Sequence, residues 1–275
     1  MPTIIEMSRL GEPEVLVARE VPAEPLKDGE LRLRHTVVGF NYLDVYLRKG
    51  VYGVPLPCVL GIEATGRVIE LGKGVRGVKV GDRVAYTNEL GAYATERTLD
   101  ASRAIALPDD VSDEDAAALL FKGQTAHMLL RRVYKVGKGD AILVHAAAGG
   151  VGLVLVRWAK ALGAAVIGTV GSQDKVVLAR SNGCDHVAVL GQDDVASFVR
   201  EVTGGGWRAG RVRLDWPRHV RGQHEEPGSV RRDGILWPGV RRNRPHRTAA
   251  SQPVWFAALH PRECRLAHRG HAHLS

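Results

Sequence analysis

Cysteine is scarce in this sequence. The three cysteines among its 275 residues, Cys58, Cys184 and Cys264, stand far apart, and no C-x-x-C pair occurs. This spacing argues against a disulfide scaffold and against a cysteine-rich zinc site, and it suits a reducing compartment. We therefore expect a cytoplasmic protein.

A leader sequence and long apolar runs are also missing. The first residues, MPTIIEMSRLGEPE, show no basic stretch followed by an apolar one, so we expect no signal peptide. The longest mostly apolar run, residues 141–156, contains His145 and three glycines. Such a run is too short and too interrupted to span a bilayer, and we expect no membrane partner.

Lysine is absent from the last quarter of the chain. Residues 1–205 hold nine lysines, with 24 Lys and Arg in all against 25 Asp and Glu, whereas residues 206–275 hold 14 Arg, no Lys and 5 acids. The net charge of +8 therefore comes entirely from residues 206–275. It says nothing about the partners of residues 1–205.

The first part of the chain shows short strands separated by glycine turns. Residues 31–41, LRLRHTVVGFN, alternate in part, and residues 64–86 read as strand, glycine-rich turn and strand. This spacing favours a small β-barrel or sandwich. Ser112 then predicts the N-cap of a helix with acids in its first turn.

Strand and helix alternate three times after residue 140. We predict strands at 141–147, 165–170 and 186–190, and helices at 151–164, from a cap at Ser172 to about 183, and at about 193–202. This alternation is typical of an α/β protein with a parallel, doubly wound sheet. A fourth strand is due after Gly205, and the residues there do not predict one.

A glycine-rich segment, HAAAGGVG at 145–152, joins the first of these strands to its helix. A pyrophosphate must approach backbone N–H groups at a helix N-terminus, where a Cβ would obstruct it. Gly149 and Gly150 are predicted to leave that approach open, and Gly152 to let the helix pack tightly on the strand. The segment Ala148–Gly149–Gly150–Val151–Gly152 is therefore predicted to bind a dinucleotide; the alternative is an ordinary glycine turn.

The residues that follow the predicted strand 165–170 indicate which nucleotide, NADH or NADPH, the site would prefer. Gly171 and Ser172 stand where NAD sites usually place a carboxylate for the ribose 2′-hydroxyl. Lys175 could meet a 2′-phosphate or could equally be a solvated lysine on the helix face, and Asp174 could instead face the ribose. We predict NADPH rather than NADH, with Gly171, Ser172 and Lys175 contributing to the site.

Several motifs together carry a family resemblance. They include GEPEVL (11–16), GFNYLDVYLRKGVY (39–52), GIEATGRVIELG (61–72), FKGQTA (121–126) and the glycine-rich segment. With them, residues 1 to about 205 resemble the zeta-crystallin-like quinone oxidoreductases, the zinc-independent branch of the medium-chain dehydrogenase/reductase family. The resemblance implies a GroES-like β-barrel catalytic domain, at 1–125, and a Rossmann domain whose first half is 126–205. It also implies a homodimer that passes hydride from NADPH to a quinone substrate.

The same resemblance implies roles for individual residues. Asn41, Tyr46 and Tyr52 would line the quinone pocket, and Thr125 would lie near the nicotinamide ribose; the alternative for both tyrosines is packing at the edge of the barrel. Asp44, Arg48 and Glu63 are expected to be structural. Leu190 stands where family members often carry a tyrosine, which weakens the case for NADPH slightly.

No metal is expected. Zinc-dependent relatives carry a cysteine and a histidine where this chain has Asn41 and Ile62, and neither of these side chains can supply a thiolate or imidazole ligand. Without zinc, alcohol oxidation lacks its Lewis acid, whereas a quinone accepts hydride without one. A zinc-independent enoyl or alkenal reductase of the same family shares the loop and the fold and stays an alternative.

Residues 206–275 have two interpretations. One is a basic arm that binds nucleic acid through phosphate contacts. The other is a frameshift product: with suitable codons, RVRLDWPRHVRGQHEEPG (211–228) read one base later gives VYDWIGRDTFEGSMKSL, in which lysine and a helical pattern return. The shifted segment is similar to what the quinone reductases carry after EVTGG. We therefore favour the frameshift and do not expect a nucleic-acid partner. We expect this chain to be poorly stable, to have little or no activity, and to be impaired in dimerisation.

Overall fold

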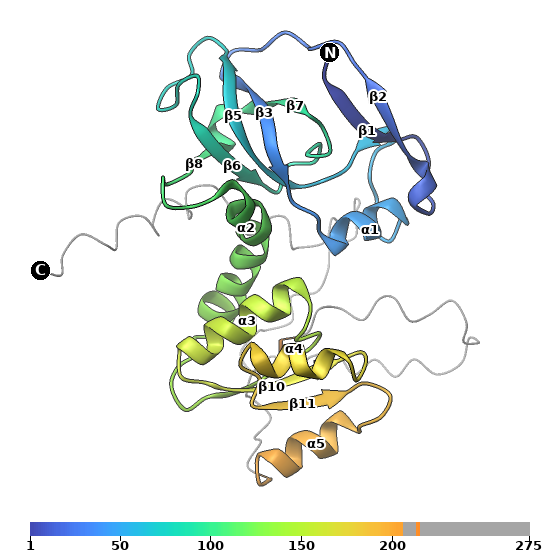
Figure 1. Cartoon of the computed structure of the whole chain (residues 1–275), viewed down its shortest axis with the longest axis vertical. Helices are drawn as coiled ribbons and strands as arrows, with labels where there is room; N and C mark the ends of the chain where they lie inside the picture. Colours follow the sequence, from blue (N-terminus) through green and yellow to red (C-terminus); the bar gives the residue numbers. More distant parts are fainter. Residues whose placement is uncertain (206–212, 215–275) are drawn as a thin grey trace, which may run out of the picture. The chain divides into compact units, whose positions relative to one another are not determined.

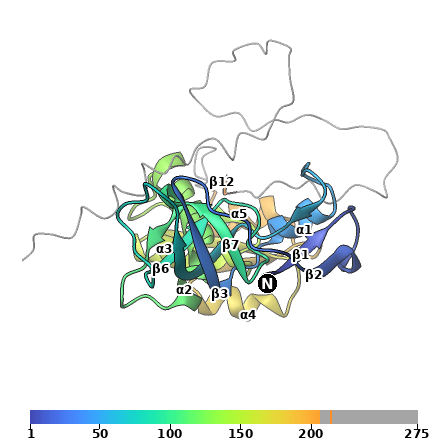
Figure 2. The same cartoon turned by 90° about the horizontal axis from the view of Figure 1, so that it is seen from above.

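The computed structural model describes residues 1–205 and 213–214 (Figures 1 and 2). The chain divides into the units Met1–Leu214 and Asp215–Ser275, and only the first is described below. The predicted frameshift segment 206–275 lies outside the described residues except for Arg213 and Leu214.

The first half of the described chain is mainly antiparallel sheet. Its elements are β1 (Thr3–Met7), β2 (Leu16–Glu20), β3 (Glu30–Val38), α1 (Tyr42–Arg48), β4 (Cys58–Val59), β5 (Glu63–Leu71), β6 (Arg83–Thr87), β7 (Glu96–Asp100) and β8 (Ile105–Ala106). They form a five-stranded sheet of order β7-β3-β5-β6-β8 and a three-stranded sheet of order β2-β1-β4. In both views β1 lies beside β2, its antiparallel partner (Figures 1 and 2).

The second half alternates strand and helix. Its elements are α2 (Asp113–His127), which ends in a wider turn at Met128–Val133, then β9 (Ala141–Val144), α3 (Gly150–Ala161), β10 (Ala165–Val170), α4 (Lys175–Ser181), β11 (His186–Val189), α5 (Val195–Val202) and β12 (Arg213–Leu214). The sheet has the order β11-β10-β9-β12, and every adjacent pair of strands is parallel. The three predicted strand–helix repeats are therefore confirmed.

Helix α2 belongs to the cores of both halves. The Ser112 hydroxyl accepts a hydrogen bond from the Asp115 N–H at 2.9 Å, as the predicted N-cap requires. Further along the helix, Phe121 packs on a cluster of the first half, whereas Ala126 lies in the core of the parallel sheet. The change from one core to the other therefore occurs inside this one helix.

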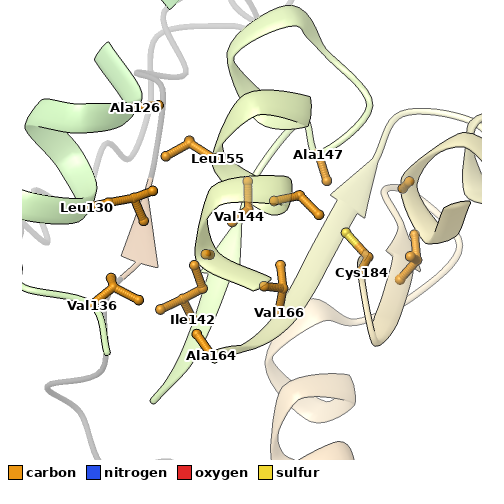
Figure 3. Packing of buried hydrophobic residues seen from close by; sticks show 14 of the residues in the cluster. Ala126, Leu130, Val136, Ile142, Val144, Ala147, Leu155, Ala164, Val166 and Cys184 are labelled. Atoms are coloured by element: carbon orange, nitrogen blue, oxygen red, sulfur yellow. The ribbon is translucent and has the colours of Figure 1, made fainter. Parts of the chain in front are cut away.

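The parallel sheet has a core on each face. Ile142, Val144 and Val166 pack with Leu155 of α3 (Figure 3). Leu143 and Ile167, which alternate with them along β9 and β10, pack instead on Val199 of α5. Because successive side chains of a strand point to opposite faces, α3 and α5 cover opposite sides of the sheet (Figure 1).

Two details of the sequence prediction were wrong. Helix α4 begins at Lys175 rather than directly after a cap at Ser172, because the backbone first makes a turn in which the Lys175 N–H bonds to the Ser172 carbonyl at 3.2 Å. A fourth strand also exists: Arg213 and Leu214 pair in parallel with Leu143 and Val144 of β9. Strand pairing uses backbone groups, so the free edge of β9 can accept a segment that lacks a strand-like side-chain pattern.

A histidine is held neutral within the five-stranded sheet. His35 Nδ1 lies 2.6 Å from the Ala94 carbonyl oxygen, and its Nε2 lies 3.0 Å from the Tyr86 hydroxyl. Both contacts are satisfied when Nδ1 carries the proton and Nε2 accepts from Tyr86. Burial lowers the pKa of His35 to about 4, and the neighbouring Arg97 adds to this effect.

This histidine is expected to make the fold sensitive to acid. Because its pKa is lower in the folded state, the unfolded chain binds more protons between pH 6.5 and about 4. As the pH falls from 6.5 to about 4, this group alone should therefore lower the free energy of unfolding by up to roughly 3 kcal/mol. Urea unfolding of the wild type and of His35→Asn at several pH values measures the difference, and parallel stability–pH curves for the two proteins would contradict it.

Candidate active site and nucleotide loop

Asn41 is held from two sides at the start of α1. It is buried, and its backbone N–H donates to the Asp44 carboxylate at 2.9 Å. Its side-chain Nδ2 donates to Glu63 Oε1 at 2.7 Å. The hydrogen bond to Glu63 therefore fixes the orientation of the Asn41 side-chain amide.

Glu63 is the centre of this arrangement. Its side chain is 0% exposed, and besides Asn41 it accepts hydrogen bonds from the Phe121 N–H at 2.9 Å and the Lys122 ammonium at 3.3 Å. A Cβ built on Gly39 would lie 2.3 Å from Glu63 Cγ, so only glycine leaves room for the glutamate there. The carboxylate connects the first residue of β5 with α1 and α2.

Asp44, the acid of the GFNYLD segment, fixes α1. Burial raises the pKa of Asp44, which accepts a hydrogen bond from the Tyr93 hydroxyl at 2.9 Å. Burial likewise raises the pKa of Tyr93 above its usual range. Arg48, at the other end of the helix, donates to the Gly11 carbonyl at 2.7 Å. The contacts of Asp44 and Arg48 thus hold the two ends of α1 against neighbouring segments, as expected for structural residues.

The structure brings Tyr46 and Tyr52 together. Their rings meet edge to face with centroids 5.8 Å apart, and Tyr42 also meets Tyr46 edge to face, with centroids 4.9 Å apart. Tyr46 and Tyr52 are half-buried, and Tyr52 also packs on the cluster of Leu43 and Leu47. This geometry agrees with a pocket wall and equally with the alternative of packing at the barrel edge.

The glycine-rich segment follows β9 directly and opens α3. Gly149 is the N-cap, with Gly150 as the first helical residue, and Ala148 and Val151 pack on the core of the parallel sheet. A Cβ built on Gly152 would lie 2.2 Å from the Ala146 carbonyl oxygen. The first turn of α3 therefore packs directly on backbone, which is the close approach predicted for Gly152.

The residues predicted to select NADPH lie at the end of β10. Gly171 and Lys175 are exposed, and Ser172 is half-buried. A hydrogen bond from Ser172 lowers the pKa of the exposed Asp174, so this neighbour of Lys175 is a carboxylate at neutral pH. Both a cation and an anion are thus present beside the predicted ribose site.

Lys122 joins the Asn41 arrangement to the glycine-rich segment. Its Nζ lies by Glu63, while its Cε lies 3.1 Å from the position that a Cβ on Gly150 would take. Thr125, one turn further along α2, donates to the Phe121 carbonyl at 3.1 Å. Lys122 was missed in the sequence, although it is the one lysine in α2 and belongs to the FKGQTA motif.

Other kinds of site have little support in the described part of the chain. Residues 1–205 and 213–214 hold no group of three His, Cys, Asp or Glu side chains that could bind a metal, and no helix there is long and apolar enough to cross a membrane. The two positions that would carry zinc ligands are the buried Asn41 and Ile62. A shallow hollow of about 490 Å³ beside β1 includes none of the predicted site residues.

The close packing at Gly152 predicts a large effect of a single methyl group. Gly152→Ala should destabilise the protein by roughly 2–3 kcal/mol, because its Cβ would overlap backbone that cannot move aside. Gly123→Ala is the matched control: it is also helical, nothing lies within 4 Å of its Cβ position, and it should stabilise by about 0.5–1 kcal/mol. Thermal unfolding compares the two, and equal stabilities would contradict the packing argument.

Comparison with known proteins gives consistent matches. Residues 27–109 match the alcohol dehydrogenase GroES-like domain, and residues 150–209 match the family described as zinc-binding dehydrogenase. The quinone oxidoreductase of Salmonella typhimurium is 45% identical over 208 residues, covering 74% of this chain and 63% of that protein. A 2-haloacrylate reductase from a Burkholderia species is 44% identical over 203 residues, covering 71% of this chain and 61% of that protein.

A solved structure agrees in both fold and sequence. The quinone oxidoreductase of Escherichia coli in complex with NADPH superposes with a TM-score of 0.72 and 42% identity, covering 74% of this chain and 63% of that one. The chain thus spans less than two thirds of the length of these relatives. Over residues 1–208 it belongs to the medium-chain dehydrogenase/reductase family, and within that family this part of the chain is similar to the quinone oxidoreductases.

Proposed function

We propose that this chain carries the catalytic and cofactor-binding parts of a zinc-independent, NADPH-dependent quinone oxidoreductase. The observation that carries the proposal is the glycine-rich opening of α3, joined through Lys122 to the buried amide of Asn41. The Escherichia coli relative, 42% identical, was solved with NADPH. A cytoplasmic location and a homodimer are part of the same proposal.

Each predicted residue has a role in this reaction. The backbone N–H groups of the segment from Ala148 to Gly152 would hold the pyrophosphate. Lys175, with Gly171 and Ser172, would hold the 2′-phosphate, and Thr125 would contact the nicotinamide ribose. NADPH supplies the hydride when bound.

The quinone side of the site depends on orientation. Asn41 can donate a hydrogen bond to the quinone oxygen on which negative charge develops, and its amide is already fixed by Glu63. Tyr46 and Tyr52 would hold the flat ring of the substrate. Because a quinone accepts hydride readily, no Lewis acid is required.

A second candidate is the reduction of an activated carbon–carbon double bond. The 44% identity to a 2-haloacrylate reductase favours it, because the same hydride donor and the same site could serve an unsaturated acid. Following NADPH oxidation with 1,4-benzoquinone and with 2-chloroacrylate in parallel separates the two. Turnover with only the acid would replace the quinone proposal, and turnover with neither, despite NADPH binding, would contradict both as activities of this chain.

The choice of cofactor makes a sharp prediction. Lys175→Gln should weaken NADPH binding roughly tenfold through loss of a charge-assisted contact, and should leave NADH binding unchanged. Arg180→Gln, which removes an exposed cation from the same helix, is the control and should change neither. Isothermal titration measures the affinities of the wild type and of both variants for NADPH and for NADH. Equal losses for NADPH and NADH would place Lys175 away from the 2′-phosphate.

We also propose that the native protein does not contain residues 206–275 as written. The family match ends at residue 209, and the similarity to the quinone oxidoreductases ends near 208, where the composition changes. The residues replaced would include the rest of the nucleotide-binding sheet, so the 275-residue chain is expected to be less stable and less active than the restored protein.

The frameshift prediction is tested on the gene. Resequencing the coding DNA across the codons for Thr203 to Gly222 should reveal one missing or extra base. The protein expressed in the restored frame should then reduce quinone much faster than the 275-residue chain. An unchanged reading frame would show that the arginine-rich segment is genuine. Salt-dependent DNA binding, lost on deletion of 206–275, would then favour the basic-arm interpretation.

A further inference from the structure

Lys122 forms an ion pair with Glu63, and the reaction outlined above assigns no role to its ammonium group. Glu63 is completely buried, and 83% of the Lys122 side chain is buried with it. Taking two charges out of water is costly, and a purely apolar contact would usually serve stability as well. The position of the pair therefore calls for an explanation other than stability.

The pair lies between two predicted parts of the site. On one side, Glu63 Oε1 accepts from both Asn41 Nδ2 at 2.7 Å and Lys122 Nζ at 3.3 Å. On the other side, the Lys122 methylenes approach Gly150, with Cδ and Cε 3.2 and 3.1 Å from its Cβ position. The Lys122 ammonium also lies 3.4 Å from the Phe40 carbonyl, next to Asn41 in the chain.

We propose that Lys122 is a positioning residue: by pairing with Glu63 and packing on the first turn of α3, it holds the acceptor of the Asn41 amide in place. It touches neither substrate nor cofactor and acts through Glu63. The functional part of this inference rests on the proposed quinone reductase activity; the effect on Asn41 does not.

The groups around Glu63 determine what the loss of Lys122 would do. Lys122 on α2 supplies a cation to this carboxylate, Asp44 on α1 is a second acid near it, and its other donors are Asn41 and the Phe121 N–H. Without the ammonium, a buried acid is left unpaired, which is costly, so its side chain is expected to change its partners. The Asn41 amide would then lose the acceptor that fixes its orientation.

The test follows the side-chain amide of Asn41 by NMR on the ¹⁵N-labelled full chain, with its signals assigned by their loss in Asn41→Asp. In Lys122→Met these signals should shift upfield from their wild-type positions, because the 2.7 Å hydrogen bond to Glu63 is lost or weakened. Lys122→Arg, which keeps a cation, should retain the wild-type positions.

A matched control is available on α3. Lys160→Met removes the ion pair of Lys160 with Asp185, 2.7 Å apart and partly exposed, and should leave the Asn41 signals as in the wild type. If Lys122→Met does not fold, Lys122→Gln replaces it, because its neutral amide can still donate to a neighbouring acceptor. That variant also lacks the ammonium and should still show the upfield shift. Unchanged Asn41 signals in a folded Lys122 variant would overturn the proposal.

Turnover adds a second readout. Lys122→Met should lower kcat with benzoquinone by about tenfold to a hundredfold while NADPH affinity changes little, because the amide is misplaced and the glycine-rich segment is intact. A folded Lys122→Met chain with wild-type kcat would overturn the functional part. A wild-type chain that binds no NADPH would instead contradict the proposed function, and the Asn41 signals would still decide the role of Lys122.

Discussion

The buried carboxylate of Glu63 is the constraint on which the candidate site depends. A charged group with no exposure to water must find partners, and this one has donors from Asn41, Phe121 and Lys122. These donors belong to two different helices. Their convergence fixes where α1 and α2 stand relative to the start of β5, and it limits residue 39 to glycine. The hydrogen bonds of this one carboxylate thus determine how α1, α2 and the start of β5 pack together.

The constraint extends to the nucleotide loop through α2. The same helix contributes Phe121 to one core and Ala126 to the other, so its placement is shared by both halves. Lys122 lies between these two residues and against the opening of α3. Lys122 therefore connects two predicted parts of the site directly. It contacts Glu63, the hydrogen-bond acceptor of Asn41, and it also lies against the glycine-rich segment.

Local patterns allowed much of this fold to be predicted, and long-range contacts accounted for what was missed. Strand 165–170 agrees with the structure at both ends because its apolar run is bounded by glycine turns. The start of α4 was missed because a turn of four residues precedes the helix and uses backbone bonds. Lys122 and Glu63 are 59 residues apart in sequence, and no periodicity relates them. A lone glutamate in an apolar strand such as GIEATG was the available signal, since a buried acid implies a cation elsewhere.

The groups predicted to bind the cofactor lie before residue 206 of this chain. The predicted contacts to pyrophosphate and 2′-phosphate all come from the turns after β9 and β10, which end within the described residues. In a doubly wound sheet, the second set of strands completes the crevice beside them. Here that side begins with β12, two residues paired in parallel with β9. The predicted binding groups for the adenosine end of a dinucleotide therefore lie in residues 1–205, and we expect the strands that complete the crevice at its nicotinamide end to come after residue 205.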